Sequence, residues 1–385
     1  MEFVAPAGNL EKLKIALAYG AKAIYLAGQR FGLRSGADNF SLAELSQATA
    51  LCRAQGAKLY LAINAMLLDE ELAALPEYLQ EIKPLAPDAV IAGDLAVAAM
   101  VGKVLGCPLH VSTQANVQNS VHAQMWKDQG ATRLVPGREL SLAEAGELGA
   151  KTGLEVEVFI HGALCMAYSG FCTISNYLAG RDSNRGGCIQ SCRFEYQLET
   201  PQGETAQVHF LNSKDLKGIA FLPEFQRYGI TAAKIEGRMK TGLYLASSLR
   251  AYLGAWRDFQ TGNWQNLAYW EEELKKIPHR DYTSGNLAGP AGAEATHWGQ
   301  GEAQTEFALA GQVLDTWPGG FALLCKNKLL ASEGIALLLP QGPAQEISLA
   351  GMQNALGQPI PQAQPGQVVR LPGVAQKHWV ARVRR

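Results

Sequence analysis

The chain lacks several features that would assign it directly to a class of protein. Of its 385 residues, 18% are charged and the formal net charge is −1, so it is not a strongly basic nucleic-acid-binding chain, although a local basic patch stays compatible with this balance. The most apolar long stretch, residues 89–105, is interrupted by Asp94 and Lys103. The sequence therefore predicts no membrane span and no membrane partner.

A secretion signal is also missing from the first residues. Residues 1–8 have neither the basic start nor the apolar core of a signal peptide. The seven cysteines are an odd number, and nothing accompanies them that would direct the chain to an oxidising compartment. We expect a cytoplasmic location, where cysteines bind metals more often than they form disulfides.

Three common catalytic or cofactor motifs are absent. The sequence has no His-Glu-x-x-His zinc motif, no Gly-x-Ser-x-Gly elbow, and no glycine-rich dinucleotide fingerprint after its first strand candidate. These absences argue against common protease and esterase machinery and against a Rossmann-type dinucleotide site.

Short apolar runs followed by turn residues recur through the first 240 residues. Segments of helical length separate most of them, and two begin with the capping-box patterns Ser41-Leu-Ala-Glu44 and Ser141-Leu-Ala-Glu144. The eight strand candidates are residues 3–5, 23–27, 59–63, 89–92, 109–112, 133–135, 155–160 and 232–235. Eight strands alternating with helices predict an α/β fold, a closed (β/α)8 TIM-like barrel, with an open doubly wound sheet as the alternative.

The pattern changes near residue 302. Short strands such as 311–314, 321–325 and 367–371 then alternate with turns, which predicts a small C-terminal antiparallel β-barrel domain. The predicted organisation is a TIM-like barrel over 1–265 carrying a cysteine loop at 162–193, a linker over 266–301, and the small β-barrel over 302–385.

Four cysteines crowd into the predicted loop: Cys165, Cys172, Cys188 and Cys192. Structural zinc sites usually have two to four residues between paired ligands. Cys188 and Cys192 satisfy this spacing, whereas Cys165 and Cys172 do not. A 4Fe–4S cluster accepts four thiolates at more varied spacings, so it is the favoured cofactor. Zinc and ordinary packing cysteines are the alternatives. The loop follows the seventh strand candidate, at the end of a barrel where catalytic groups gather.

Charged residues alternate on the last two strand candidates. Glu157 and His161 are expected to share one side of strand seven, and Lys234, Glu236 and Arg238 one side of strand eight. These strands are neighbours in a closed barrel, so we predict a Glu157–Lys234 contact. Its role is either catalytic or that of a structural ion pair.

Arg238 lies nearest the C-terminal end of its strand and could bind a carboxylate through two parallel hydrogen bonds. Arg138, Asn64 and Gln114 also follow strand candidates and are weaker candidates for the same pocket. Basic residues of the cysteine loop could contact RNA phosphates: Arg181, Arg185 and Arg193.

Long stretches of the sequence carry a family resemblance. They are His161-Gly-Ala-Leu-Cys-Met-Ala-Tyr-Ser-Gly, Cys172-Thr-Ile-Ser, Gly180-Arg-Asp-Ser-Asn-Arg-Gly-Gly-Cys188, Cys192-Arg-Phe-Glu-Tyr196, Asn212-Ser-Lys-Asp-Leu216, Lys234-Ile-Glu-Gly-Arg-Met-Lys240 and Ala5-Pro-Ala-Gly-Asn-Leu-Glu-Lys12. Together they resemble peptidase family U32, most closely its tRNA-hydroxylating branch, and the resemblance extends over the whole chain.

The resemblance implies an iron–sulfur barrel enzyme that hydroxylates C5 of the wobble uridine of tRNA and depends on prephenate. It implies tRNA and prephenate as partners, with an electron donor as a further one, and Cys165, Cys172, Cys188 and Cys192 as ligands of the 4Fe–4S cluster. The candidate catalytic residues are His161, Glu157, Lys234, Glu236 and Arg238. Alternatives are a U32-type, collagenase-like peptidase, hydroxylation of another RNA base or aromatic ring, and a non-catalytic RNA-binding iron–sulfur protein.

Overall fold

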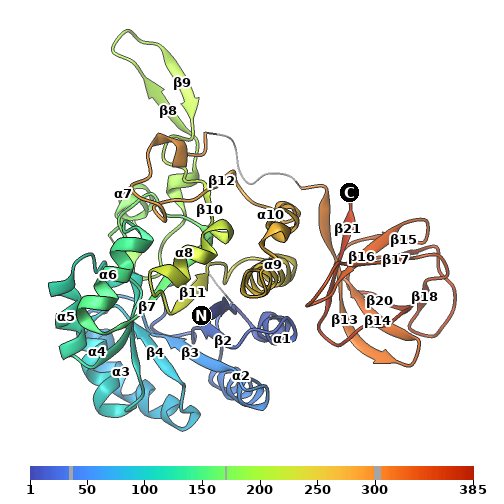
Figure 1. Ribbon diagram of the computed structural model, residues 1–385, viewed down its shortest axis with the longest axis horizontal. Coiled ribbons are helices and arrows are strands. Elements are labelled where there is room, and N and C mark those ends of the chain that lie inside the picture. Colours follow the sequence, from blue (N-terminus) through green and yellow to red (C-terminus); the bar gives the residue numbers. More distant parts are fainter. Residues whose placement is uncertain (34–37, 170, 299–304) are drawn as a thin grey trace. The chain divides into compact units, whose positions relative to one another are not determined.

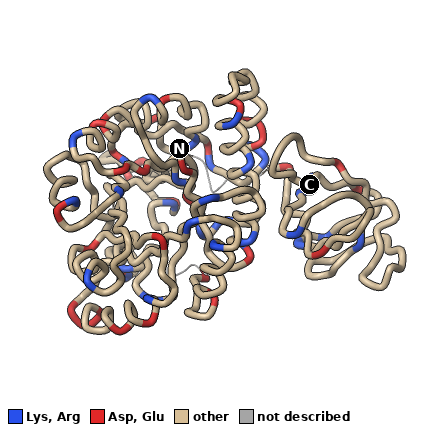
Figure 2. The backbone as a smooth tube through the Cα atoms, turned by 60° about the horizontal axis from the view of Figure 1, so that its bottom comes forward, with Lys and Arg blue, Asp and Glu red and all other residues tan. Residues whose placement is uncertain are grey.

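The computed structural model describes residues 1–33, 38–169, 171–298 and 305–385 (Figure 1). They fall into two compact units. The barrel unit contains Met1–Leu10, Lys22–Met239 and His279–Ala303. The C-terminal unit contains Glu11–Ala21, Lys240–Pro278 and Gln304–Arg385. Acidic and basic residues are interspersed along both units, as the small net charge leads one to expect (Figure 2).

The described part of the barrel unit contains a closed ring of eight parallel strands. In their order around the ring they are β11 (Ala232–Ile235), β1 (Glu2–Pro6), β2 (Ala23–Leu26), β3 (Lys58–Ala62), β4 (Ala89–Ala92), β5 (Leu109–Val111), β6 (Ala131–Leu134) and β7 (Glu155–Ala163). Pairing between β11 and β7 closes the ring. The predicted TIM-like barrel is therefore confirmed, and each of the eight predicted strands overlaps one of these.

Helices surround the strands of the barrel unit (Figure 1). They are α2 (Leu42–Ala54), α3 (Asp69–Ile82), α4 (Leu95–Val104), α5 (Ser120–Asp128), α6 (Leu142–Thr152) and α8 (Leu222–Arg227), with α7 (Ile174–Ala179) in the cysteine loop. Both predicted capping boxes are present, since Ser41 exchanges hydrogen bonds with Glu44, and Ser141 with Glu144. Single 3-10 turns lie at η1 (Lys83–Leu85), η2 (Thr113–Ala115), η3 (Ser183–Arg185), η4 (Ser191–Arg193), η5 (Ile219–Phe221), η6 (Trp264–Asn266) and η7 (Ala293–Ala295).

Inward-facing side chains fill part of the barrel with an apolar core. Strand residues alternate between the interior and the surrounding helices, so every second residue contributes. The buried cluster consists of Val4, Ala23, Tyr25, Ala27, Tyr60, Ala62, Ala89, Ile91 and Ala232. Most of these residues are small, which leaves room for the charged groups described below.

Additional strands extend the barrel beside β7. Strand β10 (Asp215–Lys217) pairs antiparallel with the end of β7, and β12 (Tyr282–Thr283) pairs with β10. A two-stranded hairpin of β8 (Tyr196–Glu199) and β9 (Thr205–Val208) follows the cysteine loop and projects from the barrel unit (Figure 1). The end of β7 is thus tied to the segments that come after the cysteine loop.

The C-terminal unit combines helices α1 (Leu10–Ala18), α9 (Gly242–Gln260) and α10 (Leu267–Lys275) with an antiparallel sheet. The sheet order is β17 (Gln345–Ser348), β16 (Gly334–Leu338), β21 (Val380–Arg384), β13 (Phe307–Trp317), β14 (Gly320–Cys325), β20 (Val368–Pro372) and β18 (Gln353–Asn354). A separate pair joins β15 (Leu329–Leu330) to β19 (Gln362–Ala363). The predicted antiparallel domain is confirmed, as a half-barrel sheet.

The segment predicted to be a linker, 266–301, is folded for much of its length. It contains α10, whose Trp270 and Leu274 are buried and whose buried Glu273 accepts hydrogen bonds from Arg250 of α9 and Arg382 of β21. These tertiary contacts stabilise α10, and the local sequence composition, which resembles that of a linker, does not reveal them. The predicted boundary between residues 301 and 302 lies outside the described residues. No helix in the described ranges is both long and apolar enough to cross a bilayer.

Candidate active site

The barrel interior contains a carboxylate with no solvent exposure, Glu157 on β7. Its Oε1 lies 2.6 Å from Nζ of Lys234 on β11, which confirms the predicted contact. Its Oε2 lies 3.2 Å from Nη1 of Arg133 on β6. A buried charge is tolerated only with such partners, so the three residues act as one electrostatic unit.

Arg133 connects this unit to a second carboxylate. Its Nη1 lies 2.6 Å from Oε1 of Glu2 on β1, which also accepts a 2.8 Å hydrogen bond from the Tyr60 hydroxyl. The sequence prediction missed Arg133 and Glu2. The available signal was an arginine within an apolar run, two residues from Ala131 and Val135 and therefore on the same side of its strand.

The interior charges perturb one another's protonation. Burial by itself would raise the pKa of Glu157, but Lys234 and Arg133 outweigh burial and hold the pKa below its ordinary value. Burial lowers the pKa of Lys234, against the opposing effect of Glu157. Burial also lowers the pKa of His110, which lies edge-on to Tyr60, to about 4. At neutral pH the interior therefore holds an ionised Glu157 and an uncharged imidazole.

A cavity opens where the barrel strands end. Its volume is about 80 Å³, and Lys234, Glu236 and Arg238 all line it, as their predicted common side requires. The other polar side chains that line it include Tyr25, Asn64, Ser112, Thr113, Gln114 and Arg138. We call this space the barrel-mouth cavity. Its two arginines and one lysine suit it to anionic ligands.

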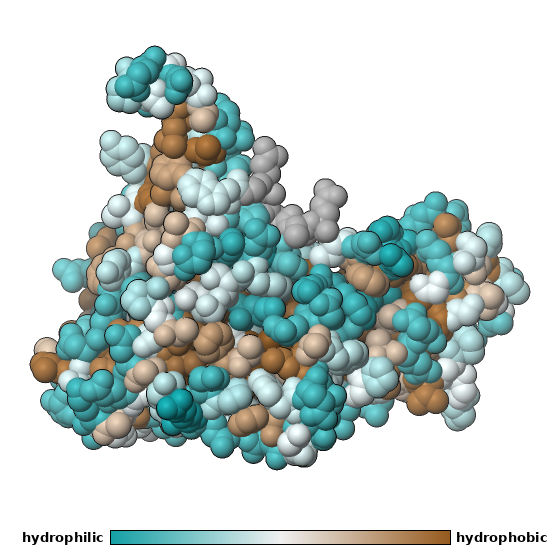
Figure 3. All heavy atoms as spheres, turned by 45° about the horizontal axis from the view of Figure 1, so that its top comes forward, coloured by the Kyte–Doolittle hydropathy of each residue, from teal (hydrophilic) through white to brown (hydrophobic). Residues whose placement is uncertain are grey.

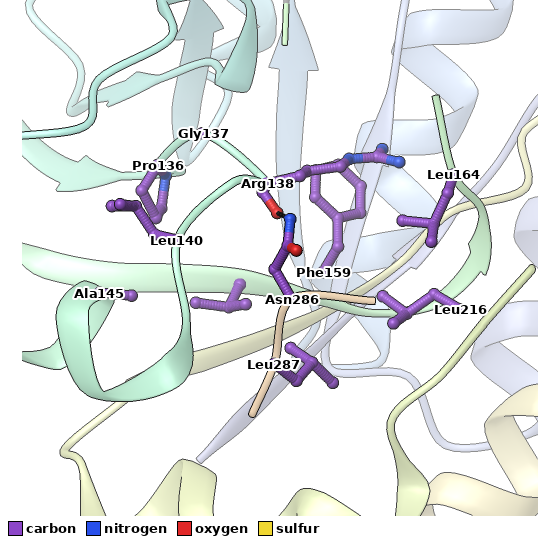
Figure 4. A pocket seen from close by; sticks show the side chains of 11 residues that line it. Pro136, Gly137, Arg138, Leu140, Ala145, Phe159, Leu164, Leu216, Asn286 and Leu287 are labelled. Atoms are coloured by element: carbon purple, nitrogen blue, oxygen red, sulfur yellow. Dashed lines mark hydrogen bonds between the residues drawn. The ribbon is translucent and has the colours of Figure 1, made fainter. Parts of the chain in front are cut away.

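Arg138 is held in place by contacts on several sides (Figure 4). Its guanidinium carbon lies 3.8 Å from the centroid of the Phe159 ring, and Nη1 donates a 2.8 Å hydrogen bond to the Ala163 carbonyl. Asn286 donates a 2.8 Å hydrogen bond to the Arg138 carbonyl. These contacts fix a cation beside the barrel mouth, at a residue that the sequence marked as a weaker candidate.

His161 lies beyond an irregularity in β7, and this corrects the expectation that its side chain follows the alternation of Glu157; its carbonyl accepts a 2.8 Å hydrogen bond from the Glu236 N–H. The pairing of β7 with β11 is regular up to Phe159 and Lys234, and then His161 pairs with Ile235, so Ile160 is an extra residue at an irregularity. One extra residue reverses the side-chain alternation. The His161 ring lies 5.7 Å from the ring of Tyr282 on β12.

The cysteine loop forms a second cavity, of about 130 Å³, which we call the cysteine cavity. Cys165, Cys172, Cys188 and Cys192 all line it. It also shares Leu33, Thr113, Gln114 and Arg138 with the barrel-mouth cavity. The four predicted ligands thus line one cavity, next to the space lined by Lys234, Glu236 and Arg238.

Hydrogen bonds fold the cysteine loop around this cavity. The Asn184 amide accepts from the Cys172 N–H at 3.2 Å and donates to the Cys172 carbonyl at 3.0 Å. The hydroxyl of Ser175 lies 3.2 Å from that of Ser191. Gly187 lies so close to the backbone of Asp182 that a Cβ would be 2.6 Å from its carbonyl oxygen. The approach to Cys188 therefore requires glycine.

The thiols of the loop are suited to a shared metal centre. None of the chain's cysteines forms a disulfide. Burial, together with the neighbouring Cys165, raises the pKa of Cys192 to about 11. A cationic centre would reverse that preference, because metal ligation deprotonates a thiol. The residues present therefore fit a group held by four thiolates.

A half-buried arginine lies beside these ligands. Arg193 lines the cysteine cavity, and burial, with neighbouring Arg280, lowers its pKa. Arg280 itself donates hydrogen bonds to Asp215 of β10 and, at 2.8 Å, to Asn212. Asp215 thus takes part in a structural ion pair.

The fold and the site together define a class of protein. It is a parallel eight-stranded barrel with a cysteine-rich loop at the ends of its strands. Within that class the chain belongs to peptidase family U32, which matches residues 8–297.

The chain is similar to proteins of three bacteria. It is 38% identical to tRNA hydroxylation protein P1 of Bacillus subtilis (strain 168), covering 82% of this chain and 77% of the relative. It is 30% identical to tRNA hydroxylation protein P of Escherichia coli (strain K12), covering 95% and 91%. It is also 30% identical to a protein named collagenase from Porphyromonas gingivalis (strain ATCC BAA-308 / W83), covering 77% and 75%.

We predict that His110 makes stability depend on pH. Its folded pKa of about 4 lies below the ordinary 6.5, so the unfolded chain binds a proton first as the pH falls. Stability is complete above about pH 6.5 and declines toward pH 4, by up to about 3 kcal/mol. Thermal unfolding of wild type and His110→Phe across this range measures the effect.

The His110→Phe variant keeps a ring beside Tyr60 but cannot titrate, so its unfolding temperature should change less between pH 4 and 6.5. His122→Gln, on helix α5, is the control and should follow wild type. A His110→Phe curve parallel to that of wild type would show that His110 does not contribute.

Proposed function

We propose that the protein is an iron–sulfur enzyme that hydroxylates C5 of the wobble uridine of tRNA in the cytoplasm, with prephenate as co-substrate. The observation that carries this proposal is the cavity lined by all four loop cysteines, which shares lining residues with the barrel-mouth cavity. Relatives named tRNA hydroxylation proteins, at 30–38% identity over most of the chain, support the RNA substrate.

A 4Fe–4S cluster is the proposed cofactor, with Cys165, Cys172, Cys188 and Cys192 as its ligands. The described residues contain no group of three or more His, Cys, Asp or Glu side chains placed to hold one metal ion. A four-iron cluster is larger than one ion, so its thiolates stand further apart than those of a zinc site. When bound, such a cluster supplies redox chemistry or an electrostatic anchor for the loop.

The barrel-mouth cations are proposed to bind the co-substrate. Prephenate carries two carboxylates, and Arg138 and Arg238 line the same small cavity. A guanidinium binds a carboxylate through two parallel hydrogen bonds, so each arginine suits one carboxylate. Arg238 lies on the segment after β11, 3.4 Å from the Asn39 side-chain oxygen, and Arg138 is held against Phe159.

Glu236 and the interior ion pair are proposed to have different roles. When C5–H of the uridine becomes C5–OH, the proton at C5 needs an acceptor in the cavity. Glu236 lines the barrel-mouth cavity and is the carboxylate proposed to accept that proton. Glu157 is fully buried and paired, so we assign it, with Lys234, to positioning the strands that carry the mouth residues.

We predict that each loop cysteine is required for iron binding. Protein purified without air should contain about four irons per chain and absorb as a brown iron–sulfur protein. Cys172→Ser and Cys188→Ser should lose most of the iron and the absorbance. The measurement is iron and acid-labile sulfide analysis with visible spectroscopy.

Cys107→Ser offers a matched control, because this half-buried cysteine lies outside the loop. Its iron content should equal that of wild type. Equal iron in the loop variants, or an iron-free wild-type protein prepared anaerobically, contradicts the proposed cofactor.

We predict that the iron-loaded protein forms 5-hydroxyuridine in tRNA only when prephenate is present. Purified tRNA from a strain lacking the gene is the substrate, and mass spectrometry of its nucleosides is the measurement. Arogenate, which resembles prephenate but bears an amino group, is a useful comparison. Unmodified tRNA after incubation with cluster-loaded protein and prephenate would reject the proposed reaction.

We predict that Arg238→Gln raises the KM for prephenate at least tenfold while changing the apparent affinity for tRNA little. The reason is the loss of a bidentate carboxylate contact, which costs on the order of 1.5–3 kcal/mol. Arg238→Lys keeps the charge but loses the two parallel N–H donors of the guanidinium, so its KM for prephenate should lie between those of wild type and Arg238→Gln. An unchanged KM for prephenate would remove Arg238 from the proposed binding site.

A further inference from the structure

The cysteine loop presents aromatic side chains to solvent. Tyr177 is 93% exposed, Tyr168 60%, Phe171 57% and Phe194 47%. Large aromatic residues usually bury most of their surface, so four exposed ones in a single loop need an explanation. We call these four residues the aromatic rim. Figure 3 shows apolar residues gathered near the base of the projecting β8–β9 hairpin, which directly follows the loop.

The rim residues belong to the same folded loop as the cysteines. Tyr168 lines the cysteine cavity, and Phe171 immediately precedes Cys172, whose backbone is bonded to Asn184. Tyr177 lies on α7, which contacts η4 through Ser175 and Ser191, and Phe194 directly follows η4. The cysteine cavity and the rim are therefore built by one piece of chain.

Charge near the rim favours a polyanion. The Arg181 side chain, which follows α7, is exposed and has no ion-pair partner in the described part of the chain. Arg185, by contrast, is engaged by Glu71 at 2.8 Å, with Nε 3.7 Å from Asp182. An exposed cation four residues after Tyr177, in a loop with exposed aromatic rings, matches the combination that binds a single-stranded nucleic acid, with rings for the bases and a guanidinium for a phosphate.

The position of the barrel-mouth cavity supplies the reason for such a surface. Its lining residues lie at the ends of the barrel strands, so a base that is stacked between its neighbours can meet them only after leaving its stack. The nucleotides beside an extruded base lose a stacking neighbour. Exposed aromatic side chains can replace that neighbour for any base, because every base has a π-face.

We propose that the aromatic rim stacks the unpaired bases that flank the target uridine in a single-stranded RNA loop, and that Arg181 contacts the adjoining phosphate. This inference rests on the proposed RNA-modifying function and adds the surface that binds the RNA. The rim residues are positioning residues. They determine how tightly the loop binds and leave the chemical step at the barrel mouth unchanged.

The test measures RNA binding without catalysis. Fluorescence anisotropy of a labelled RNA stem–loop with uridine in its loop gives the Kd for wild type, Tyr177→Leu, Phe171→Leu and Arg181→Gln. Leucine keeps an apolar side chain but removes the π-face, so we expect roughly five- to tenfold weaker binding for each aromatic variant. Tyr177→Phe and Tyr177→Trp should bind like wild type. Arg181→Gln should reduce the salt dependence of binding.

Several controls separate this inference from its alternatives. Met125→Ala, at a 60% exposed position on α5, should bind RNA like wild type. Fully paired RNA should bind weakly and should not distinguish wild type from the leucine variants. Unchanged Kd values for Tyr177→Leu and Phe171→Leu overturn the inference. So does a change of oligomeric state in sedimentation with no change in RNA affinity, because the rim would then be a contact between copies.

The hydroxylation assay distinguishes a failure of this inference from a failure of the proposed function. If the function holds and the inference holds, the leucine variants raise the KM for RNA and keep kcat at saturating RNA. If wild type hydroxylates tRNA while the leucine variants bind RNA normally, only the inference fails. If wild type binds RNA through the rim but forms no hydroxyuridine, only the proposed reaction fails.

Discussion

The structure depends most on the neutralisation of one buried carboxylate. Glu157 has no contact with solvent, so its charge requires both Lys234 and Arg133. Through these contacts it connects β7 to β11 and β6, and Arg133 extends the connection to Glu2 on β1. The strands β1, β11, β7 and β6 are consecutive in the ring. A polar network that is fully paired in this way restricts the barrel to one register, because a shifted strand would leave a charge buried without a partner.

This constraint also explains where a ligand can bind. Apolar side chains and the interior ion network occupy the barrel, and polar side chains line a cavity at the ends of the strands. Arg138, Glu236 and Arg238 come from the segments that follow β6 and β11, so the fixed strands fix their positions. The cysteine loop follows β7, between these two strands in the ring. The order of the strands thus explains why the cysteine cavity lies next to the barrel-mouth cavity.

Much of this arrangement could be predicted from the sequence, for identifiable reasons. The eight strands can be recognised because each is a short apolar run bounded by turn residues. Alternation along two strands that are neighbours in a closed barrel predicted the Glu157–Lys234 contact. Alternation failed for His161, since a register irregularity at Ile160 leaves no mark in composition. The helix α10 was missed because its stability comes from contacts of Glu273 with distant Arg250 and Arg382. Local sequence patterns predict the elements whose formation depends on neighbouring residues. They miss the features that depend on contacts between residues far apart in the sequence.

The position of His161 matters for the question whether the site could work as a peptidase, which the family name suggests. A cysteine peptidase needs a base within hydrogen-bonding reach of its nucleophile, and a histidine close to Cys165 in sequence is the natural candidate. The irregularity in β7 instead places the His161 ring beside Tyr282, which itself stacks on His279 with 4.0 Å between ring centroids. The described residues that line the cysteine and barrel-mouth cavities include arginines, a lysine, a glutamate and amides, but no histidine. Such a lining suits an anionic ligand better than it suits peptide hydrolysis. Because one fold hosts many chemistries, the residues at the site weigh more here than the name of the family.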